Sequence, residues 1–422
     1  MNSKQLIKKF WPAAIVVALV LIIGVFLTPG MQSRLLWRWE VVRTYVNGVI
    51  HPVSPIPTAN PGSITLIAPQ PTATQIGITA TASTTQSTQF PTQATAEPTS
   101  NPTAIPQTVI LDTPPYEKQD INNCGPATLA MYLRYYGWKG DQFTISDVIK
   151  PIAQDRNVNV EELDYYTKNY AGWLQTIYRV GGDLELIKKL LAAGVPVMIE
   201  ETFHFDENFW PNDDRWAGHY LLINGYDDQN RKFLGQDSFA GENKWFDYDL
   251  IDRQWQAFNR VYILVYLPEQ EATIQAILGD NWDVDKNRQN ALDIAKQETE
   301  SDPQNVYAWF NLGSNYVYFD ENNFATQAYD KARQIGWPQR MLRYQFGPFL
   351  AYFHSLRTDD LMSLVDYALE RTPNSEEALL WKGWGLYRLG DKQKAIESFQ
   401  AALAAHPNYL DAQYALDYVN QN

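Results

Sequence analysis

Cysteine is nearly missing from this chain: its 422 residues include a single one, Cys124. One cysteine excludes an intrachain disulfide and every metal site built from several cysteines. Positive charge is also scarce, since 34 Lys and Arg stand against 48 Asp and Glu, a formal net charge of -14. An acidic field of this size repels phosphate backbones, so we expect no nucleic-acid partner.

Charged residues are absent from residues 10–27, which follow a short segment containing three lysines. At about 1.5 Å of rise per residue, this apolar run nearly spans a bilayer core and predicts one membrane helix. No small-residue cleavage pattern follows Leu27, which favours an uncleaved anchor over a signal peptide. Arginines at 34, 38 and 43 almost balance the lysines, so charge leaves the orientation of the helix open.

Residues 51–108 contain one charged side chain, Glu97, and consist mainly of Thr, Pro, Ala, Ser and Gln. This composition cannot bury enough apolar surface to offset the entropy of ordering, and it predicts a disordered linker. Pro/Thr-rich stalks are typical outside the membrane. We therefore expect the large C-terminal part to be extracytoplasmic, with a cytoplasmic tether of the same length as the alternative.

Residues 109–268 change from a helical period to an alternating one. Apolar side chains at Leu129, Tyr132, Leu133 and Tyr136 predict an amphipathic helix that ends at the glycine after them. Further helices are predicted at 146–153, 160–170 and 183–192, and strands at 195–201, 218–227, 231–237 and 260–267. The pattern indicates one α+β domain, with helices first and an antiparallel sheet second.

Residues 269–422 are helical and periodic. Pro303, Pro338, Pro373 and Pro407 recur every 34 or 35 residues, and each closes a segment with a helical pattern. Such a period is the signature of a repeat protein, whereas an ordinary helical bundle would produce it only by chance.

Two of these segments resemble tetratricopeptide repeats, whose signature is W-x-x-L-G-x-x-Y followed by Ala, an aromatic residue, Ala and Pro. Trp309, Leu312, Gly313 and Tyr316 match the first part of the signature, and Gly383 stands at the offset of Gly313 in the last segment. The small residues should let paired helices approach closely. The resemblance implies an all-α domain that binds a protein partner.

Cys124 stands where the predicted helix should begin. Gly125 allows a tight approach, and Pro126 suits the first helical turn. A helix N-terminus or a protonated histidine lowers the pKa of a nearby thiol. The lower pKa matters because the thiolate, not the thiol, is the nucleophile. A lone cysteine is more often an inert buried residue, so the catalytic interpretation requires a base.

His219 is the better candidate for that base. Three of the other histidines lie in the linker or the repeats: His51, His354 and His406. His204 and His219 share the domain of Cys124, and His219 opens a predicted strand. A tight hairpin turn near residues 228–229 would place it almost opposite Asp237, as a carboxylate that orients an imidazole requires. A core histidine at a strand end is the alternative.

Gln119 precedes Cys124 by five residues. When a thiolate attacks a carbonyl, the Gln119 amide and the Cys124 N–H could both donate to the oxyanion that forms.

The stretches "QDINNCGPATLAMYLRYYG", "GHYLLINGYD" and "GQDS" resemble the cysteine peptidases that trim double-glycine leader peptides in bacteriocin exporters, in particular their free-standing relatives. Over residues 111–268, the resemblance implies a papain-like fold with Cys124 as nucleophile, His219 as general base and acid, Asp237 as its orienter and Gln119 as oxyanion donor.

The chain departs from that family in two ways. Ser238 follows Asp237 where the family usually has proline, and no G-x-x-x-x-G-K-[ST] phosphate loop is present, so the exporter machinery is missing. Leader trimming is therefore not the expected activity. The stretch "HFDENFWPNDDRW", residues 204–216, places aromatic and acidic residues just before His219. It fits a substrate-binding lip and a solvated loop with buried Trp anchors equally well.

These predictions give four parts: a membrane anchor and juxtamembrane helix (1–50), a linker (51–108), a papain-like domain (109–268) and a tetratricopeptide domain (269–422). The leading hypothesis is a membrane-anchored cysteine peptidase that acts on a peptide or protein substrate through an acyl-enzyme. We expect it to need no metal or cofactor and to recruit a protein partner through its repeats. A non-catalytic binding scaffold, and a thiol amidase or acyl transferase that acts on the cell wall, are the alternatives.

Overall fold

The computed structural model describes residue 24 and residues 29–60, 105–152 and 155–421. The predicted membrane helix at 10–27 lies outside these residues except for Gly24, as does most of the predicted linker. The first long helix that is described is α2, Pro29–Ile50. Within the described ranges, no helix combines the length and the apolar character needed to cross a bilayer.

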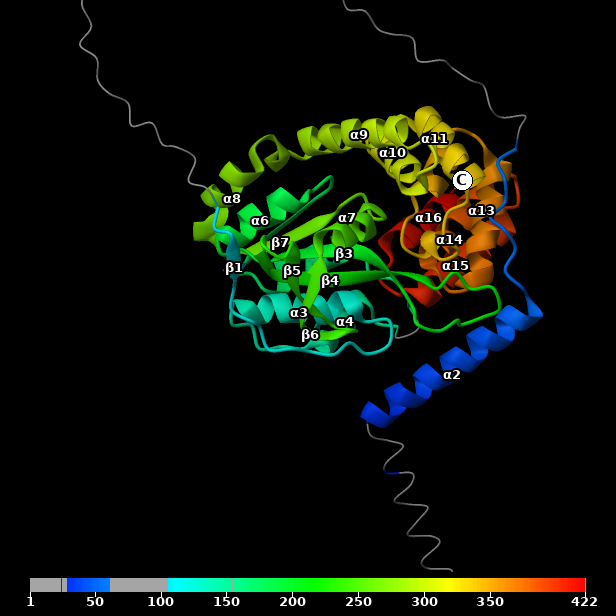
Figure 1. The fold of residues 1–422 in the computed structure, drawn as a ribbon. Coiled ribbons are helices and arrows are strands. Elements are labelled where there is room, and N and C mark those ends of the chain that lie inside the picture. Colours follow the sequence, from blue (N-terminus) through cyan, green and yellow to red (C-terminus); the bar gives the residue numbers. More distant parts are fainter. Residues whose placement is uncertain (1–23, 25–28, 61–104, 153–154, 422) are drawn as a thin grey trace, which may run out of the picture.

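An antiparallel sheet of seven strands forms the centre of the first domain, in the order β2-β7-β3-β4-β5-β6, with β1 paired to β4 (Figure 1). Its strands are β1 Thr108–Ile110, β2 Gln175–Arg179, β3 Val197–His204, β4 Trp216–Asp227, β5 Lys232–Asp237, β6 Gly241–Asp247 and β7 Tyr262–Tyr266. Its helices are α3 Cys124–Tyr135, α4 Gln142–Ile149, α5 Val160–Tyr170, α6 Leu184–Ala192, α7 Tyr248–Gln256 and α8 Glu271–Leu278.

The long central strands were predictable because each is a run of β-branched or aromatic residues. The structure confirms the predicted strands as β3, β4, β5 and β7. The order of helices first and sheet second is wrong in detail, because β1 and β2 precede those strands and α7 lies between β6 and β7. The helix predicted at 146–153 begins earlier, at Gln142, because the Asp141 carboxylate caps it by accepting a hydrogen bond from the Thr144 N–H at 2.8 Å.

Alternate residues of the central strands face opposite sides of the sheet and build two cores. Met198, Tyr220 and Leu222 pack on one face against α3 and its neighbours. Ile199 and Leu221 pack on the other face in the core that contains residues of α6, α7 and α8. Helices therefore cover both faces of the sheet, and this burial fixes the strand register. It leaves the strand ends near the start of α3 for a functional site.

The C-terminal domain consists of stacked antiparallel helices (Figure 1). They are α9 Val284–Ser301, α10 Val306–Tyr318, α11 Asn322–Ile335, α12 Gly347–His354, α13 Thr358–Arg371, α14 Glu376–Arg388, α15 Lys392–Ala405 and α16 Leu410–Gln421. The expected close approach of paired helices is confirmed: a Cβ atom on Gly313 would lie 2.7 Å from the Tyr329 ring, and one on Gly383 would lie 2.3 Å from the Phe399 ring.

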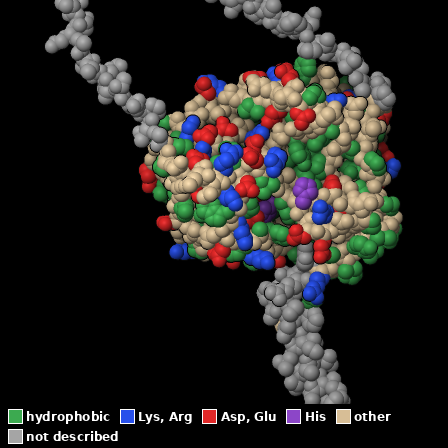
Figure 2. Space-filling view, in the orientation of Figure 1, with side chains coloured by type: hydrophobic (Ala, Val, Ile, Leu, Met, Phe, Trp, Pro, Cys, Tyr) green, Lys and Arg blue, Asp and Glu red, His purple; other side chains and the backbone are tan. Residues whose placement is uncertain are grey.

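The two domains share a hydrophobic core. Trp216 and Phe258 of the first domain belong to one buried cluster with Phe310 and Met341 of the second. The Trp216 indole N–H also donates to the Tyr307 hydroxyl at 2.9 Å. On the face shown in Figure 2, acidic and basic side chains are intermingled rather than gathered by sign.

Candidate active site

Cys124 is the first residue of α3 and is half-buried. The first amides of a helix have no intrahelical acceptor, so the Cys124 N–H lies in a turn that can donate outwards. Gly125 is required directly behind it, because a Cβ atom there would meet the Tyr220 ring at 3.3 Å. The close packing of α3 on β4 thus brings the sulfur to the end of the strand that carries His219.

His219 and Asp237 are in contact, but not by the predicted register. The prediction placed them almost directly opposite each other, whereas Leu222 pairs with Gln236 and a bulge interrupts the ladder between Ile223 and Gly225. The longer turn shifts the ladder by two residues and the bulge returns it by one, so His219 reaches Asp237 diagonally. Its Nε2 atom lies 2.9 Å from the Asp237 Oδ1 atom.

The Asp237 carboxylate is held in place by the turn that follows β5. Its Oδ1 atom accepts hydrogen bonds from the backbone N–H groups of Phe239 at 2.8 Å and Ala240 at 2.9 Å, in addition to the His219 contact. Burial would raise the pKa of Asp237, but the charge and hydrogen bond of His219 and these two amides hold it below its usual value. Asp237 is therefore ionised and occupies one ring nitrogen of His219.

The other ring nitrogen of His219 is left for Cys124. Burial would raise the pKa of the Cys124 thiol, but its hydrogen bond to His219 and the charges of His219 and Lys150 lower it. Burial would lower the pKa of His219, but Asp237 and Cys124 raise it well above the usual value. These opposite shifts favour a thiolate beside an imidazolium.

Gln119 lies beside the acid as well as before the nucleophile. Its side-chain oxygen accepts a hydrogen bond from the Ser238 hydroxyl at 2.9 Å, and its backbone N–H donates to the Ser238 carbonyl at 2.9 Å. With the oxygen occupied, the amide NH2 is the part of Gln119 that remains to donate to a substrate oxygen. The structure thus brings all four predicted residues together: Gln119, Cys124, His219 and Asp237.

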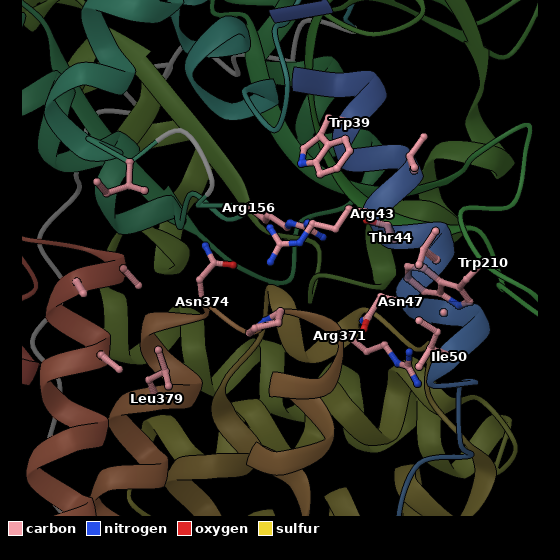
Figure 3. Close-up of a pocket in the computed structure, with 18 residues that line it drawn as sticks. Trp39, Arg43, Thr44, Asn47, Ile50, Arg156, Trp210, Arg371, Asn374 and Leu379 are labelled. Carbon is pink, nitrogen blue, oxygen red and sulfur yellow. The ribbon is translucent and has the colours of Figure 1, made fainter. Parts of the chain in front are cut away.

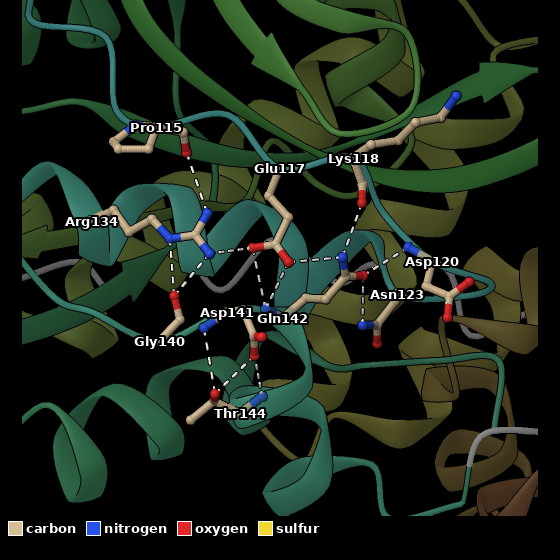
Figure 4. A network of polar contacts seen from close by, with 10 residues as sticks. All are labelled: Pro115, Glu117, Lys118, Asp120, Asn123, Arg134, Gly140, Asp141, Gln142 and Thr144. Carbon is tan, nitrogen blue, oxygen red and sulfur yellow. Dashed lines mark hydrogen bonds and ion pairs between the residues drawn. The ribbon is translucent and has the colours of Figure 1, made fainter. Parts of the chain in front are cut away.

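Residues 117–123 are clamped by a polar network on the N-terminus of α4 (Figure 4). The Gln142 side-chain oxygen accepts from the Asp120 N–H at 2.7 Å and from the Asn123 side chain at 2.9 Å. Its NH2 group donates to Glu117 at 2.9 Å, and Glu117 forms an ion pair with Arg134 of α3 at 2.6 Å. Gln142 therefore fixes the segment that carries Gln119 relative to the helix that carries Cys124.

Two regions of the chain match models of known protein families. Residues 110–264 match the model of the Peptidase_C39 like family, and residues 376–409 match the tetratricopeptide repeat model. This chain carries a Peptidase_C39-like domain followed by tetratricopeptide repeats. None of the curated proteins compared with it matches.

Solved structures similar to the Peptidase_C39-like domain include one from Bacillus anthracis described as a C39-like peptidase, with 18% identity, a TM-score of 0.30, and coverage of 38% of this chain and 97% of that chain. The peptidase domain of Streptococcus ComA, a bifunctional ABC transporter, has 15% identity, a TM-score of 0.29, and coverage of 37% and 99%. On the repeat side, the tetratricopeptide protein YrrB has 16% identity, a TM-score of 0.19, and coverage of 34% and 88%.

Lys150 is a charged residue of the Peptidase_C39-like domain that the sequence did not single out. It is buried, and its ammonium group donates to the carbonyl of Asn122, a residue held at a φ of 52°. This contact stabilises the strained turn just before Cys124, and the positive charge contributes to the low pKa of the thiol.

Two further carboxyl groups are buried near the Peptidase_C39-like site on β3. Glu201 pairs with His219 across the ladder, and burial raises its pKa to about 8. Glu200 pairs with Tyr220, and burial followed by the charge of Cys124 raises its pKa well above the usual value. Both are protonated near neutral pH, so they add no negative charge beside the thiolate.

Other polar groups lie away from this site. Among the described residues, Asp155, Glu376 and His406 form a group that could hold a metal ion, with ligand atoms within 4.8 Å of one another, at the contact between the two domains. A cavity of about 760 Å³ lies between α2 and the repeats, and its lining includes Arg156 and Arg371 (Figure 3). None of the residues of the candidate active site lines this cavity.

Sequence reasoning missed Ser238 and Gln142 as parts of the Peptidase_C39-like site. Ser238 was visible as a departure from the family pattern, but its hydroxyl acquires a role only because β5 ends beside residue 119. Gln142 had no signal in the sequence, since it acts from the start of another helix. His204 lies at the end of β3 opposite Trp216 and is exposed, which agrees with the choice of His219 over it.

Proposed function

We propose that the Peptidase_C39-like domain hydrolyses peptide bonds through Cys124, His219, Asp237 and Gln119. The observation that carries the proposal is the contact between the His219 Nε2 atom and the Asp237 Oδ1 atom at 2.9 Å, in a ring whose charge lowers the pKa of the Cys124 thiol. Such a chain of contacts activates a cysteine nucleophile and leaves the imidazole as the proton carrier.

In the first half of the proposed reaction, the Cys124 sulfur attacks the carbonyl carbon of the scissile bond. The negative charge that develops on the carbonyl oxygen is stabilised by the Gln119 NH2 group and the Cys124 N–H. The His219 imidazolium then gives its proton to the leaving nitrogen, the C–N bond breaks, and a thioester remains on the sulfur.

In the second half, His219 removes a proton from a water molecule that attacks the thioester carbonyl. The C–S bond breaks, the carboxylic acid product leaves, and the thiolate beside the imidazolium is restored. None of these steps calls on a metal ion or an organic cofactor.

The thiolate provides a direct test. The full-length protein would be treated with iodoacetamide at pH 6, with His219→Ala as the matched variant, and the modification of Cys124 would be followed by mass spectrometry. We expect alkylation at least about tenfold faster in the wild type, because an activated cysteine has a pKa below the usual value near 8.5. Equal, slow rates in both proteins would instead favour a non-catalytic scaffold.

We also propose that the tetratricopeptide domain binds a protein partner or substrate, and that residues 10–27 attach the protein to a membrane with its C-terminal part outside the cytoplasm. The membrane attachment is supported only by the apolar run in the sequence. Protease treatment of intact cells tests it, with release of a fragment that carries both domains as the expected result and full protection as the opposing one.

A further inference from the structure

A row of phenylalanine rings leads away from the candidate active site. The Phe203 ring lies 5.2 Å from the His219 ring in an edge-to-face contact, and 5.4 Å from the Phe239 ring. Phe205 continues the row, with its centroid 4.9 Å from Phe203 and 6.4 Å from Phe239. We call Phe203, Phe205 and Phe239 the phenylalanine shelf.

The phenylalanine shelf is open to solvent. Phe239 is 44% exposed, although its backbone N–H is bound to the Asp237 carboxylate, and Phe203 and Phe205 are half-buried. Covering the exposed apolar surface of these rings with an apolar group would be favourable. Aromatic walls beside a few fixed polar groups are typical of ligand sites.

The outer end of the shelf is held by the tetratricopeptide domain. Arg340 forms a buried ion pair with Asp213 at 2.6 Å and places its guanidinium group 5.5 Å from the Phe205 ring centre. The Gln339 N–H donates to the Asp214 carboxylate at 2.7 Å. These contacts anchor the loop of residues 205–215, so the shelf is positioned by both domains.

The place of the shelf relative to the catalytic groups indicates which half of a substrate meets it. Gln119 and the Cys124 N–H hold the carbonyl side of the scissile bond, whereas His219 must reach the leaving nitrogen to protonate it. The shelf adjoins His219 through the edge-to-face contact of the Phe203 ring. A group bound on the shelf is therefore part of the leaving-group side.

We propose that the phenylalanine shelf is a subsite for an apolar, preferably aromatic, side chain on the residue that follows the scissile bond. This inference rests on the proposed function and names its substrate class: peptides with a large apolar residue directly after the bond that is cleaved.

The subsite can be tested without the natural substrate, because an acyl-enzyme also reacts with added amines. With p-nitrophenyl acetate, Cys124 takes the acetyl group and p-nitrophenolate leaves. An amine nitrogen then attacks the thioester carbonyl, the C–N bond forms, the C–S bond breaks, and the amine proton passes to His219 while the sulfur leaves as thiolate. The amine occupies the leaving-group side, by microscopic reversibility.

The experiment compares L-phenylalaninamide with glycinamide as acceptors for the full-length protein, with Cys124→Ala as the blank. We expect the acetyl transfer rate to be about tenfold higher for phenylalaninamide, as expected for partial burial of an aromatic side chain. Phe239→Ala and Phe203→Leu should bring the ratio to about threefold or less. Phe324→Ala removes an exposed ring of α11 and should leave the ratio unchanged.

The outcomes separate the two proposals. Acetylation of Cys124 with equal transfer to both amides would overturn the subsite and leave the proposed function standing. A preference for phenylalaninamide that survives both shelf variants would also overturn it, because the preference would come from elsewhere. Absence of p-nitrophenolate release above the Cys124→Ala blank would overturn the proposed function and the subsite with it.

Discussion

The Ser238 hydroxyl donates a hydrogen bond to the side-chain oxygen of Gln119 at 2.9 Å, and Ser238 is fully buried. The residue after Asp237 therefore fixes the rotation of the Gln119 amide, the proposed oxyanion donor. A proline at this position, as the family resemblance leads one to expect, would lack a hydroxyl. In this chain Asp237 and the proposed oxyanion donor Gln119 are linked through Ser238.

Ser238→Ala should lower the rate of acetylation of Cys124 by p-nitrophenyl acetate by about tenfold, a smaller loss than the about 10²-fold expected for Gln119→Ala. The amide would still be present but free to rotate. We expect kcat to fall with little change in KM, because the oxyanion forms only in the transition state. Ser238→Thr keeps the hydroxyl and should recover most of the rate. Full activity in Ser238→Ala would remove Ser238 from the site.

Asp237→Asn should move the formation of the Cys124 thiolate to higher pH. The Asp237 carboxylate raises the pKa of His219, and the His219 imidazolium lowers the pKa of Cys124. Without that negative charge His219 loses its proton at lower pH, and the thiol is then less acidic. The midpoint of the alkylation rate against pH should rise by about 1 unit. An unchanged profile would contradict the assignment of Asp237 as the orienting carboxylate.

Glu162 should make the protein less stable as the pH rises. Burial raises its pKa to about 8, and the charges of Asp155 and Glu377 add to the shift. A carboxyl group whose pKa is raised in the folded state does not lower the free energy of unfolding below its unfolded pKa of about 4.3. Above that pH the free energy of unfolding falls, and it continues to fall until the pH passes the folded pKa.

Glu162→Gln should therefore raise Tm at pH 8.5 by about 4 °C or more and have little effect at pH 5. The substitution keeps an oxygen that can accept the hydrogen bond from the Asn159 N–H, which measures 2.7 Å in the structure. Thermal unfolding followed by circular dichroism at the two pH values provides the measurement. An equal change at both would show that ionisation is not the cause.

Gly383→Ala should destabilise the last repeat by about 1–3 kcal/mol, because the added methyl group would lie 2.3 Å from the Phe399 ring. Phe399→Leu in the same chain should recover part of the loss, so the two substitutions should not be additive. Gly172→Ala, which places its methyl group in open space, is the control. Chemical denaturation gives the free energies, and a Gly383→Ala protein as stable as the control would contradict the close helix contact.

The helical character of the repeats was predictable because their stability comes from neighbours in sequence. The Tyr329 ring packs closely on Gly313 within one pair of helices, Trp309 packs against the same hydrophobic cluster, and Pro373 marks a helix end by removing a backbone donor. The edge strands β1, β2 and β6 were not predicted, because an edge strand forms where a neighbouring strand presents free backbone groups to it.

The residue types of the candidate site also follow from the sequence alone. Cys124 is the only cysteine, and His219 is one of two histidines in the same domain. The manner of the His219–Asp237 contact does not follow from the sequence. A bulge near Asn224 moves the ladder by one residue, and a bulge depends on packing across several strands rather than on the local sequence.

The sequence by itself determined which chemistry is available: one thiol, a histidine, a carboxylate and an amide in an order that matches a known peptidase family, followed by a repeat with a period of about 35 residues. Only the tertiary structure decided how these groups are held: Ser238 against Gln119, Gln142 against residues 117–123, and Arg340 against the loop beside the phenylalanine shelf. The physical reason is that nucleophilicity follows from the type of side chain, whereas positioning depends on contacts between residues far apart in the chain, which exist only after the sheet and both domains have packed.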